Sequence, residues 1–424
     1  MKFWTIRFVL ALGVLLPALC FAQEPWIAPG PGYPAPGNPP AGGMLPPGYG
    51  NPAPGLYEEL VPRSRILYDT DSRCDLTFKE TFANTYVRLD YLMWQITGGR
   101  NALLGAPNSS GADLSGKDPD NLLVASDRNG TRAPSPTYAV VPNLPDNRDI
   151  LNGLRGVFGI PTRAGTFESE IFYFEQMDNR VAFAPTQTTN SFGFTRPLIA
   201  ATTLLSNGEV SPSTMILYSD GYQAREKVSF FGAESNWIFP AFLPNVPTTV
   251  SPILGFRYVS FQDKMSIAGV DEPDDTTTLN HYIGSIARNN IFGPQIGLRF
   301  STTVGRLDLN MEPKFVAGIN RLSEGVSTRQ IYSPTEEDRH DNDTRTVFSP
   351  IFDLSFSTKL HLSERFAVYV AYDMMVAGGF SRAYNNVYYN SSSTPSDPPQ
   401  ISLRRGLSSF FAQGFAVGGE LTFR

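Results

Sequence analysis

Charged side chains recur at every second position in several short segments of this 424-residue chain, and they are its main candidates for chemistry. Successive side chains of a β-strand point to opposite faces, so each such segment would have one charged face and one apolar face. If the charged faces share an interior, their side chains must pair, because an unpaired buried charge is costly. We predict an interior location for Arg88, Asp90, Glu168, Glu170, Glu234, Arg257, Arg299, Asp308, Glu312, Lys314, Asp353, Lys359 and Glu420.

Catalysis is poorly supported by the other reactive residues. A nucleophile and its base must be placed together, but His281, His340 and His361 are widely separated, and no GxSxG, HExxH or CxxC motif occurs. The acidic runs VDEPDD (270–275) and EEDRHDND (336–343) lack the spacing of a calcium loop. A Ser-His-acid site assembled across loops remains an alternative. We predict no enzyme, catalytic residue, metal or cofactor.

The alternation is clearest in the last segment, residues 407–424. Phe411, Phe415, Val417, Leu421 and Phe423 alternate there with small or polar residues. This is typical of the closing strand of an outer-membrane β-barrel, with apolar side chains toward lipid and an aromatic residue at the interface. Residues 85–97 have the same two faces, and we predict that they form the first strand and pair with the last.

Ten segments show the alternation, and the connections between them are long and short in turn. Membrane barrels alternate long external loops with short periplasmic turns, whereas a soluble β-sandwich has no reason to do so. We predict an all-β fold, an antiparallel transmembrane barrel of about ten strands (roughly 8–12) with both termini in the periplasm. The segments are 85–97, 152–161, 164–176, 227–238, 251–264, 289–302, 306–318, 348–361, 365–377 and 407–424.

The long connections are expected to be polar external loops at 98–151, 177–226, 265–288, 319–347 and 378–406. Trp94 and Trp237 fall near opposite ends of their strands, and we expect them to belong to the aromatic girdles at the membrane interfaces.

The N-terminal region divides into three parts. Residues 1–22 have a positive start, a short apolar core and small residues before Ala22, which predicts a cleaved signal peptide. A lipoprotein signal at Cys20 is a weaker alternative. Residues 23–55 are rich in Pro and Gly and should be a disordered periplasmic segment. Residues 56–84 lead into the barrel, expected at 85–424, and beyond the signal no apolar run is long enough for a transmembrane helix.

Composition limits the partners. The formal net charge is -6, without a cluster of Lys or Arg, so nucleic acid is not expected. Removal of the signal would leave Cys74 as the only cysteine, which excludes an intrachain disulfide. We expect contact with outer-membrane lipid and lipopolysaccharide, with barrel-assembly machinery through the C-terminal strand, and with cell-wall material through the Pro/Gly-rich segment. The oligomeric state is not predicted.

Several motifs occur in an order that resembles a known family. They are YVRLDYLMW in the first strand, TRPL at 195–198, GAESNW at 232–237, GFRY at 255–258, NIFGPQIGLRF at 290–300 and the closing FFAQGFAVGGELTF. Together they resemble the planctomycete family of putative beta-barrel porins, family seven, whose function is unknown. The resemblance implies an outer-membrane barrel in a diderm bacterium, and the family name implies a pore. No catalytic or binding residue follows from it.

Two functions remain open. About eight strands leave a barrel interior just filled by side chains, whereas about sixteen to eighteen leave an aqueous channel. Ten strands lie near the filled end of this range. The leading function is a non-enzymatic, porin-like protein with at most a narrow pore for small solutes. The alternative is a structural anchor or surface-binding platform that acts through its external loops and has a lumen filled by ion pairs. A soluble secreted sandwich is a third interpretation.

Overall fold

A computed structural model of the chain describes residues 84–97, 104–105, 137–140, 150–189, 195–206, 209–242, 248–274, 276–331, 333–391 and 401–423. All of them belong to one compact unit, Thr70–Arg424. The expected signal peptide, the Pro/Gly-rich segment and the pre-barrel segment up to residue 83 lie outside the described residues. No helix in the described part of the chain is both long enough and apolar enough to cross a membrane.

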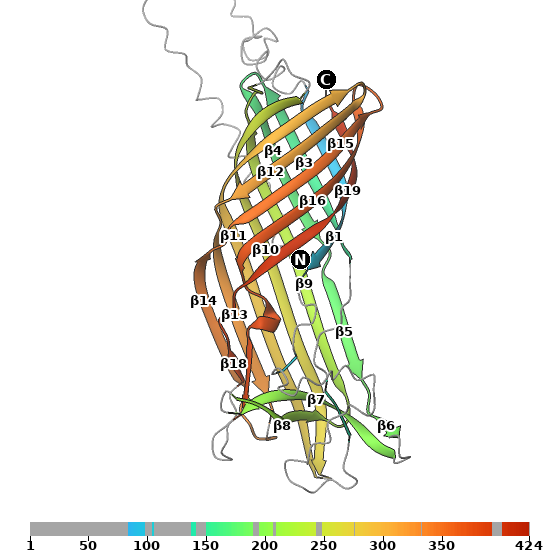
Figure 1. Cartoon of the computed structure of the whole chain (residues 1–424), viewed down its shortest axis with the longest axis vertical. Coiled ribbons are helices and arrows are strands. Elements are labelled where there is room, and N and C mark those ends of the chain that lie inside the picture. The colour runs from blue at the N-terminus through green and yellow to red at the C-terminus, as the bar shows by residue number, and fades with distance from the viewer. Residues whose placement is uncertain are drawn as a thin grey trace, which may run out of the picture. The chain divides into compact units, whose positions relative to one another are not determined.

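Ten antiparallel strands form a closed ring (Figure 1). In ring order they run β10-β9-β4-β3-β1-β19-β16-β15-β12-β11, and pairing of β10 with β11 closes the ring. The predicted fold and strand number are therefore confirmed. The strands are β1 (Tyr86–Thr97), β3 (Ile150–Thr162), β4 (Gly165–Phe174), β9 (Tyr222–Ile238), β10 (Thr248–Asp274), β11 (Thr277–Val304), β12 (Leu307–Val316), β15 (Ile351–His361), β16 (Phe366–Phe380) and β19 (Ser408–Thr422).

The first and last strands pair with each other, as the sequence predicts. β1 and β19 run antiparallel from Tyr86 opposite Thr422 to Thr97 opposite Phe411. On the inner face the small residues Gly414 and Gly418 of β19 lie against β1, and a Cβ on Gly418 would clash with the Leu89 carbonyl oxygen. The alternation of large and small residues in the closing strand thus lets the two ends of the sheet approach closely.

The two ends of the barrel differ. At one end, here called the short-turn end, tight turns join β3 to β4, β11 to β12 and β15 to β16, and β1 begins and β19 ends there. Gly305 takes a φ of 66° in the turn between Val304 and Leu307, a conformation that favours glycine. The opposite end, here called the long-loop end, carries the longer connections.

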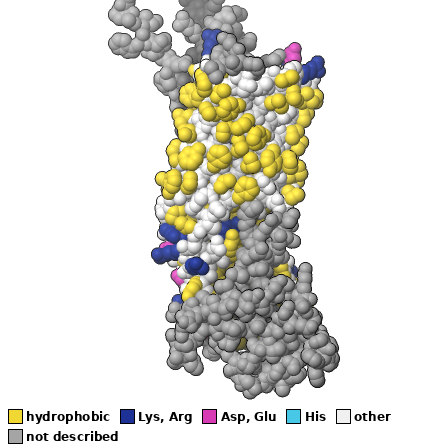
Figure 2. Space-filling model, viewed as in Figure 1, with side chains coloured by type: hydrophobic (Ala, Val, Ile, Leu, Met, Phe, Trp, Pro, Cys, Tyr) yellow, Lys and Arg dark blue, Asp and Glu magenta, His cyan; other side chains and the backbone are white. Residues whose placement is uncertain are grey.

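Large apolar side chains cover the outer surface of the ring (Figure 2). Leu89 is 62% exposed, Ile296 59% and Phe415 55%, and each occupies an outward position next to inward polar or small residues. A soluble protein does not leave a continuous apolar surface of this size in water. This apolar band is the surface that a lipid bilayer would cover.

Where the structure describes the segments expected to be long loops, much of their length is β-structure, which differs from the loop conformation predicted for those residues. β9, β10 and β11 continue beyond the apolar band, and β5 (Met177–Phe183), β13 (Ile319–Arg329) and β14 (Arg339–Phe348) pair alongside them. We call this part of the wall the extension. The inward residues Met265 and Ile267 keep the two-residue period there, but their outward neighbours are polar or small, so the segment resembled a loop.

The extension has its own apolar core. It packs Tyr218, Tyr222, Ile267, Ile283 and Tyr389 together with neighbouring buried residues. The remaining strands form a second sheet or pair at its edges: β2 (Thr137–Val140), β6 (Thr186–Thr189), β7 (Thr195–Ser206), β8 (Glu209–Tyr218), β17 (Val387–Ser391) and β18 (Ile401–Leu403), with a short helix η2 (Ala383–Asn385).

A charge placed on the apolar band should destabilise the protein only if this surface faces lipid. We expect Leu89→Arg to lower the free energy of unfolding from lipid vesicles by about 2–4 kcal/mol. The control is Thr344→Arg, at an exposed outward position on β14 in the extension, which should change it by less than about 0.5 kcal/mol. Guanidinium titration of the refolded proteins measures both values. Equal stability of the two variants would contradict a lipid-facing band.

Candidate functional site in the barrel lumen

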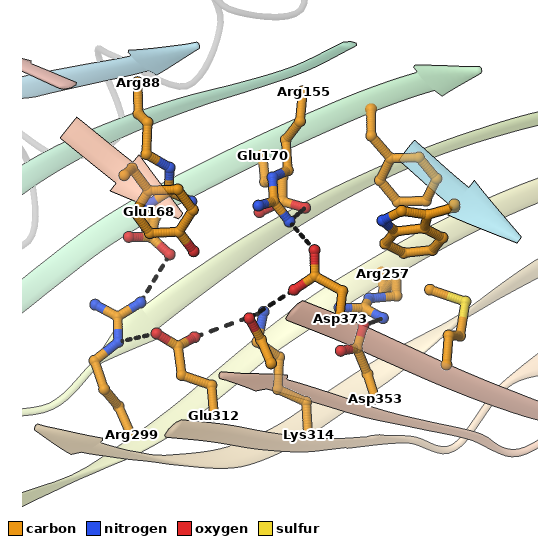
Figure 3. A pocket seen from close by; sticks show the side chains of 15 residues that line it. Arg88, Arg155, Glu168, Glu170, Arg257, Arg299, Glu312, Lys314, Asp353 and Asp373 are labelled. Carbon is orange, nitrogen blue, oxygen red and sulfur yellow. Dashed lines mark hydrogen bonds and ion pairs between the residues drawn. The ribbon is translucent and has the colours of Figure 1, made fainter. Parts of the chain in front are cut away.

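Ion pairs cross the interior of the barrel near the short-turn end (Figure 3). Arg257 on β10 is 3% exposed and pairs both with Glu234 on the adjacent strand β9 and with Asp353 on β15, which is not its neighbour in the ring. Arg155 Nη1 on β3 donates to Asp373 Oδ2 on β16 at 2.9 Å, again between non-adjacent strands. Such pairs can form only if the side chains extend across the lumen.

The network continues through further carboxylates. Arg299 lies 3.0 Å from Glu168 and 2.6 Å from Glu312, and Lys314 Nζ donates to Glu234 Oε1 at 2.6 Å. Each carboxylate is thus matched by a cation, as buried charges require.

All thirteen charged residues singled out from the sequence lie in this network or beside it, and each except Asp308 has a partner of opposite charge within 4 Å. Lys359 pairs with Glu420 at 2.7 Å, and the partly exposed Asp308 pairs with His361 at 2.7 Å. We call this set, with Arg155 and Asp373, the ion-pair layer. Sequence analysis missed Arg155 and Asp373, although each occupies an inward position of an alternating strand.

Little free space remains within the ion-pair layer. The cavity among its side chains measures ≈ 30 Å³, about the volume of one water molecule in the liquid. The guanidinium of Arg88 adds to the packing, since its Cζ lies 3.9 Å from the centroid of the Tyr369 ring. The layer therefore fills the lumen with paired charges.

A second layer, made of apolar side chains, lies next to the ion-pair layer. Every one of the ten barrel strands contributes to it, so it extends around the whole circumference. We call it the aromatic layer, after the aromatic side chains that it contains. Its residues are Leu92, Trp94, Leu151, Phe172, Phe174, Val228, Phe230, Val259, Phe261, Ile291, Val316, Ile351, Tyr369, Ala371, Met375, Ala377, Phe380, Phe410, Ala412 and Ala416.

The aromatic rings of this layer meet in the middle of the lumen. Phe230 on β9 contacts Phe410 on β19 with ring centroids 5.6 Å apart, although these strands are not neighbours in the ring. Phe410 also stacks on Phe380 at 4.8 Å, and Phe230 stacks on Phe174 at 5.4 Å. Aromatic pairs of this kind stabilise by about 0.5–1.5 kcal/mol each beyond the area they bury.

The expected interface position of Trp94 is wrong. Trp94 is 4% exposed and packs inside the barrel against Phe174 at 5.2 Å, whereas Trp237 occupies an outward position beside the turn at Gly165. Sequence analysis missed the aromatic layer because it assigned one apolar face to each strand. The signal was present in runs such as Leu92-Met93-Trp94, where both faces are apolar and hence both are covered.

Besides the ion-pair layer and the aromatic layer, a third group of residues, 379–386, closes the lumen at the long-loop end. Gly379 has a φ of 63° and lies in a register shift between β16 and β19, which redirects the chain. Arg382, 2% exposed, then donates from Nε to Asp263 at 2.7 Å and from Nη2 to Glu226 at 3.2 Å. Asn289 binds the backbone of Ser381 through both of its amide atoms at 2.9 Å. We call residues 379–386 the mouth segment.

Two of the three histidines make hydrogen bonds to oxygen atoms of the protein. His281 Nδ1 lies 2.6 Å from the Gln330 carbonyl oxygen, and burial in the extension lowers the pKa of its imidazole below the usual value. His361 binds Asp308. Among the described residues no histidine is hydrogen-bonded to a Ser, Thr or Cys side chain, and no group of His, Cys, Asp and Glu could hold a metal ion.

The closed ring, its apolar outer band and its filled interior define a β-barrel of the outer-membrane type. Residues 86–423 match the model of the family described as "Putative beta barrel porin-7", and the chain belongs to this family. The resemblance found in the sequence motifs is thereby confirmed. No curated protein matches the chain.

Solved outer-membrane barrels resemble the fold at low sequence identity. The outer membrane protease OmpT from Escherichia coli is 11% identical with a TM-score of 0.41, covering 81% of this chain and 98% of that chain. The toluene transporter TodX from Pseudomonas putida is 8% identical with a TM-score of 0.23, covering 80% and 89%. The CymD monoaromatic hydrocarbon channel is 6% identical with a TM-score of 0.20, covering 82% and 91%. At these scores none carries an argument about function.

The ion-pair layer should be sensitive to the loss of a single cation. Arg257→Ala leaves Asp353 buried without an ion pair, and we expect a loss of about 3–5 kcal/mol of unfolding free energy. The matched control is Arg225→Ala, which breaks an exposed pair with Asp178 and should cost far less, because solvent screens an exposed pair. Guanidinium titration in vesicles compares them, and equal losses would show that the charges inside the barrel are solvated.

Proposed function

We propose that this protein is a non-conducting outer-membrane barrel that works through its extension, as a surface-binding platform or structural anchor. The observation that carries the proposal is the aromatic layer, to which all ten strands contribute and whose rings meet across the lumen. A layer of tightly packed apolar side chains leaves no path for water or ions. The ion-pair layer on one side and the mouth segment on the other support the same conclusion.

We also propose an orientation for the barrel in the outer membrane of a diderm bacterium. Barrels of this kind place their short turns in the periplasm and their long connections outside the cell. The short-turn end, with the start of β1 and the end of β19, would then face the periplasm. The extension, with its own apolar core, would project from the cell surface as a rigid structure that a partner could bind.

The proposed function is not enzymatic. A nucleophile needs a base within hydrogen-bonding distance. The contacts of His281 and His361 are instead with a backbone carbonyl and a carboxylate, which fits a structural role for both.

A narrow pore is the second candidate, and membership in a family described as porins favours it. Such a pore would have to open by displacing both the mouth segment and the aromatic rings. The mouth segment is held mainly by hydrogen bonds and ion pairs, which can exchange with water, and Gly379 could act as a hinge. The rings below it have no polar partner to exchange, so opening them would expose apolar surface.

Conductance separates the two candidates. The refolded chain in a planar lipid bilayer should give no stepwise current at neutral pH, because the aromatic layer excludes water. Insertion is verified by a gel mobility shift on heating in SDS, and an open porin treated identically serves as the positive control. Reproducible unit steps from the folded chain would contradict the proposal and favour the pore.

A further inference from the structure

Positively charged side chains are concentrated on the outward surface of the extension. The outward positions of β9, β10, β11 and β13 beyond the apolar band carry six of them, and we call these residues the basic face: Arg225, Lys227, Lys264, Arg288, Arg321 and Arg329. Among the described residues, the outward positions within 223–229, 260–268, 280–290, 321–329 and 340–346 contain no carboxylate, and the neighbouring strand β5 contributes one, Asp178, opposite Lys227.

Positive and negative side chains of these strands lie on opposite faces, although both occur close together in the sequence. Glu226, Asp263 and Glu324 occupy inward positions of the same strands, each within three residues of a cation of the basic face. The whole chain has a formal net charge of -6, so a surface with an excess of positive charge runs against its overall balance. Such a surface attracts anions.

Most of this positive charge has no protein partner. Arg225 is bound by Asp178, and Lys227 lies 3.9 Å from the same carboxylate, which can neutralise only one of them. Lys227 is directly opposite Lys264 across β9 and β10, and like charges in that position destabilise a sheet. Among the described residues Lys264, Arg288 and Arg321 form no ion pair. An anion bound between them would remove the repulsion.

Along the strands, the basic face directly follows the apolar band. On β13 the outward Ile319 is followed by Arg321, and on β11 the outward Phe292 is followed by Asn290 and then Arg288. Two to four residues correspond to about 7–13 Å along a strand, and less along the membrane normal for a tilted strand. Along β11, apolar side chains are followed by a hydrogen-bonding side chain and then by a cationic one. A membrane leaflet has the same order, with the hydrocarbon chains followed by carbonyl or hydroxyl groups and then by phosphates.

A groove of ≈ 420 Å³ opens among these cations. It is bordered by Arg225, Lys227 and Lys264 on one side. Its floor includes Gly284 and Gly325, which occupy outward positions without a side chain, and Ile286 lies between them in the sheet. A headgroup with both a charged and an apolar part would fit such a surface.

We propose that the basic face binds the phosphate groups of anionic lipids in the leaflet at the long-loop end, with the groove accepting the part of the headgroup that projects from the leaflet. Bound lipid would hold the extension at a fixed height and angle above the membrane. The inference does not depend on whether the lumen conducts, so a conducting barrel would leave it intact.

The test uses the full chain refolded in a neutral maltoside detergent and titrated with short-chain phosphatidic acid, with binding measured by calorimetry at low and high salt. The wild-type protein should bind the lipid more weakly as salt increases. Lys264→Gln combined with Arg288→Gln removes two unpaired cations and should weaken binding about thirty-fold. Arg339→Gln combined with Arg404→Gln removes the same charge from exposed positions outside the basic face and should leave binding unchanged.

Three results would overturn the proposal. Equal weakening in both double variants would mean that only net charge matters. Equal binding of inorganic phosphate would identify a free anion as the ligand, and binding of heparin without binding of phosphatidic acid would identify an acidic polysaccharide. Short-chain phosphatidylcholine, which is neutral, should bind no better to the wild type than to either variant. A heat-dependent mobility shift verifies that every variant is folded.

Discussion

Closure of the sheet is the constraint on which the structure depends. Inside a lipid bilayer every backbone N–H and C=O group must be hydrogen-bonded within the protein, because no water is available. A sheet meets this requirement only if its first and last strands pair, as β1 and β19 do over the full length of β1. Ten strands close around an interior narrow enough for inward side chains to fill. The strand number thus permits the filled lumen, and the large inward side chains of this chain fill it.

The inward side chains fill the narrow lumen in two different ways. Near the short-turn end the inward side chains are charged, and their burial is tolerable because they pair across the barrel, as Arg257 does with Asp353. Farther along, the inward side chains are aromatic and exclude water by direct contact, as Phe230 and Phe410 do. The ion-pair layer leaves space for about one water molecule, and the aromatic layer adds a second, apolar set of packed side chains across the lumen. Beyond the apolar band β9, β10 and β11 continue, joined by β5, β13 and β14, and form the extension, with carboxylates such as Glu226 and Asp263 on the inner surface and the basic face on the outer one.

The sequence predicts the wall of the barrel well and its interior only in part. Strands such as 85–97 and 407–424 are evident because lipid on one side and polar neighbours on the other impose a strict two-residue period. The extension was taken for loops because water on its outer surface removes the large apolar residues that mark a membrane strand. Trp94 was misplaced because an aromatic residue near the end of a strand is equally compatible with an interface and with a covered interior. Arg382 could not be found, since its burial depends on a turn of the chain at Gly379 and on carboxylates from distant strands.

The central claim, that aromatic side chains seal the lumen, can be tested most directly by chemical access. Ala412 is fully buried in the aromatic layer, whereas Ser229 is partly exposed at an outward position on β9. Ala412→Cys and Ser229→Cys would be compared in a chain whose Cys20 and Cys74 are replaced by Ser, refolded in detergent and treated with a charged thiol reagent. The account predicts rapid modification at position 229 and none at position 412 until the barrel is heated. Modification of Ala412→Cys in the folded barrel, at a rate near that of Ser229→Cys, would mean that water and ions pass through the lumen and would contradict it.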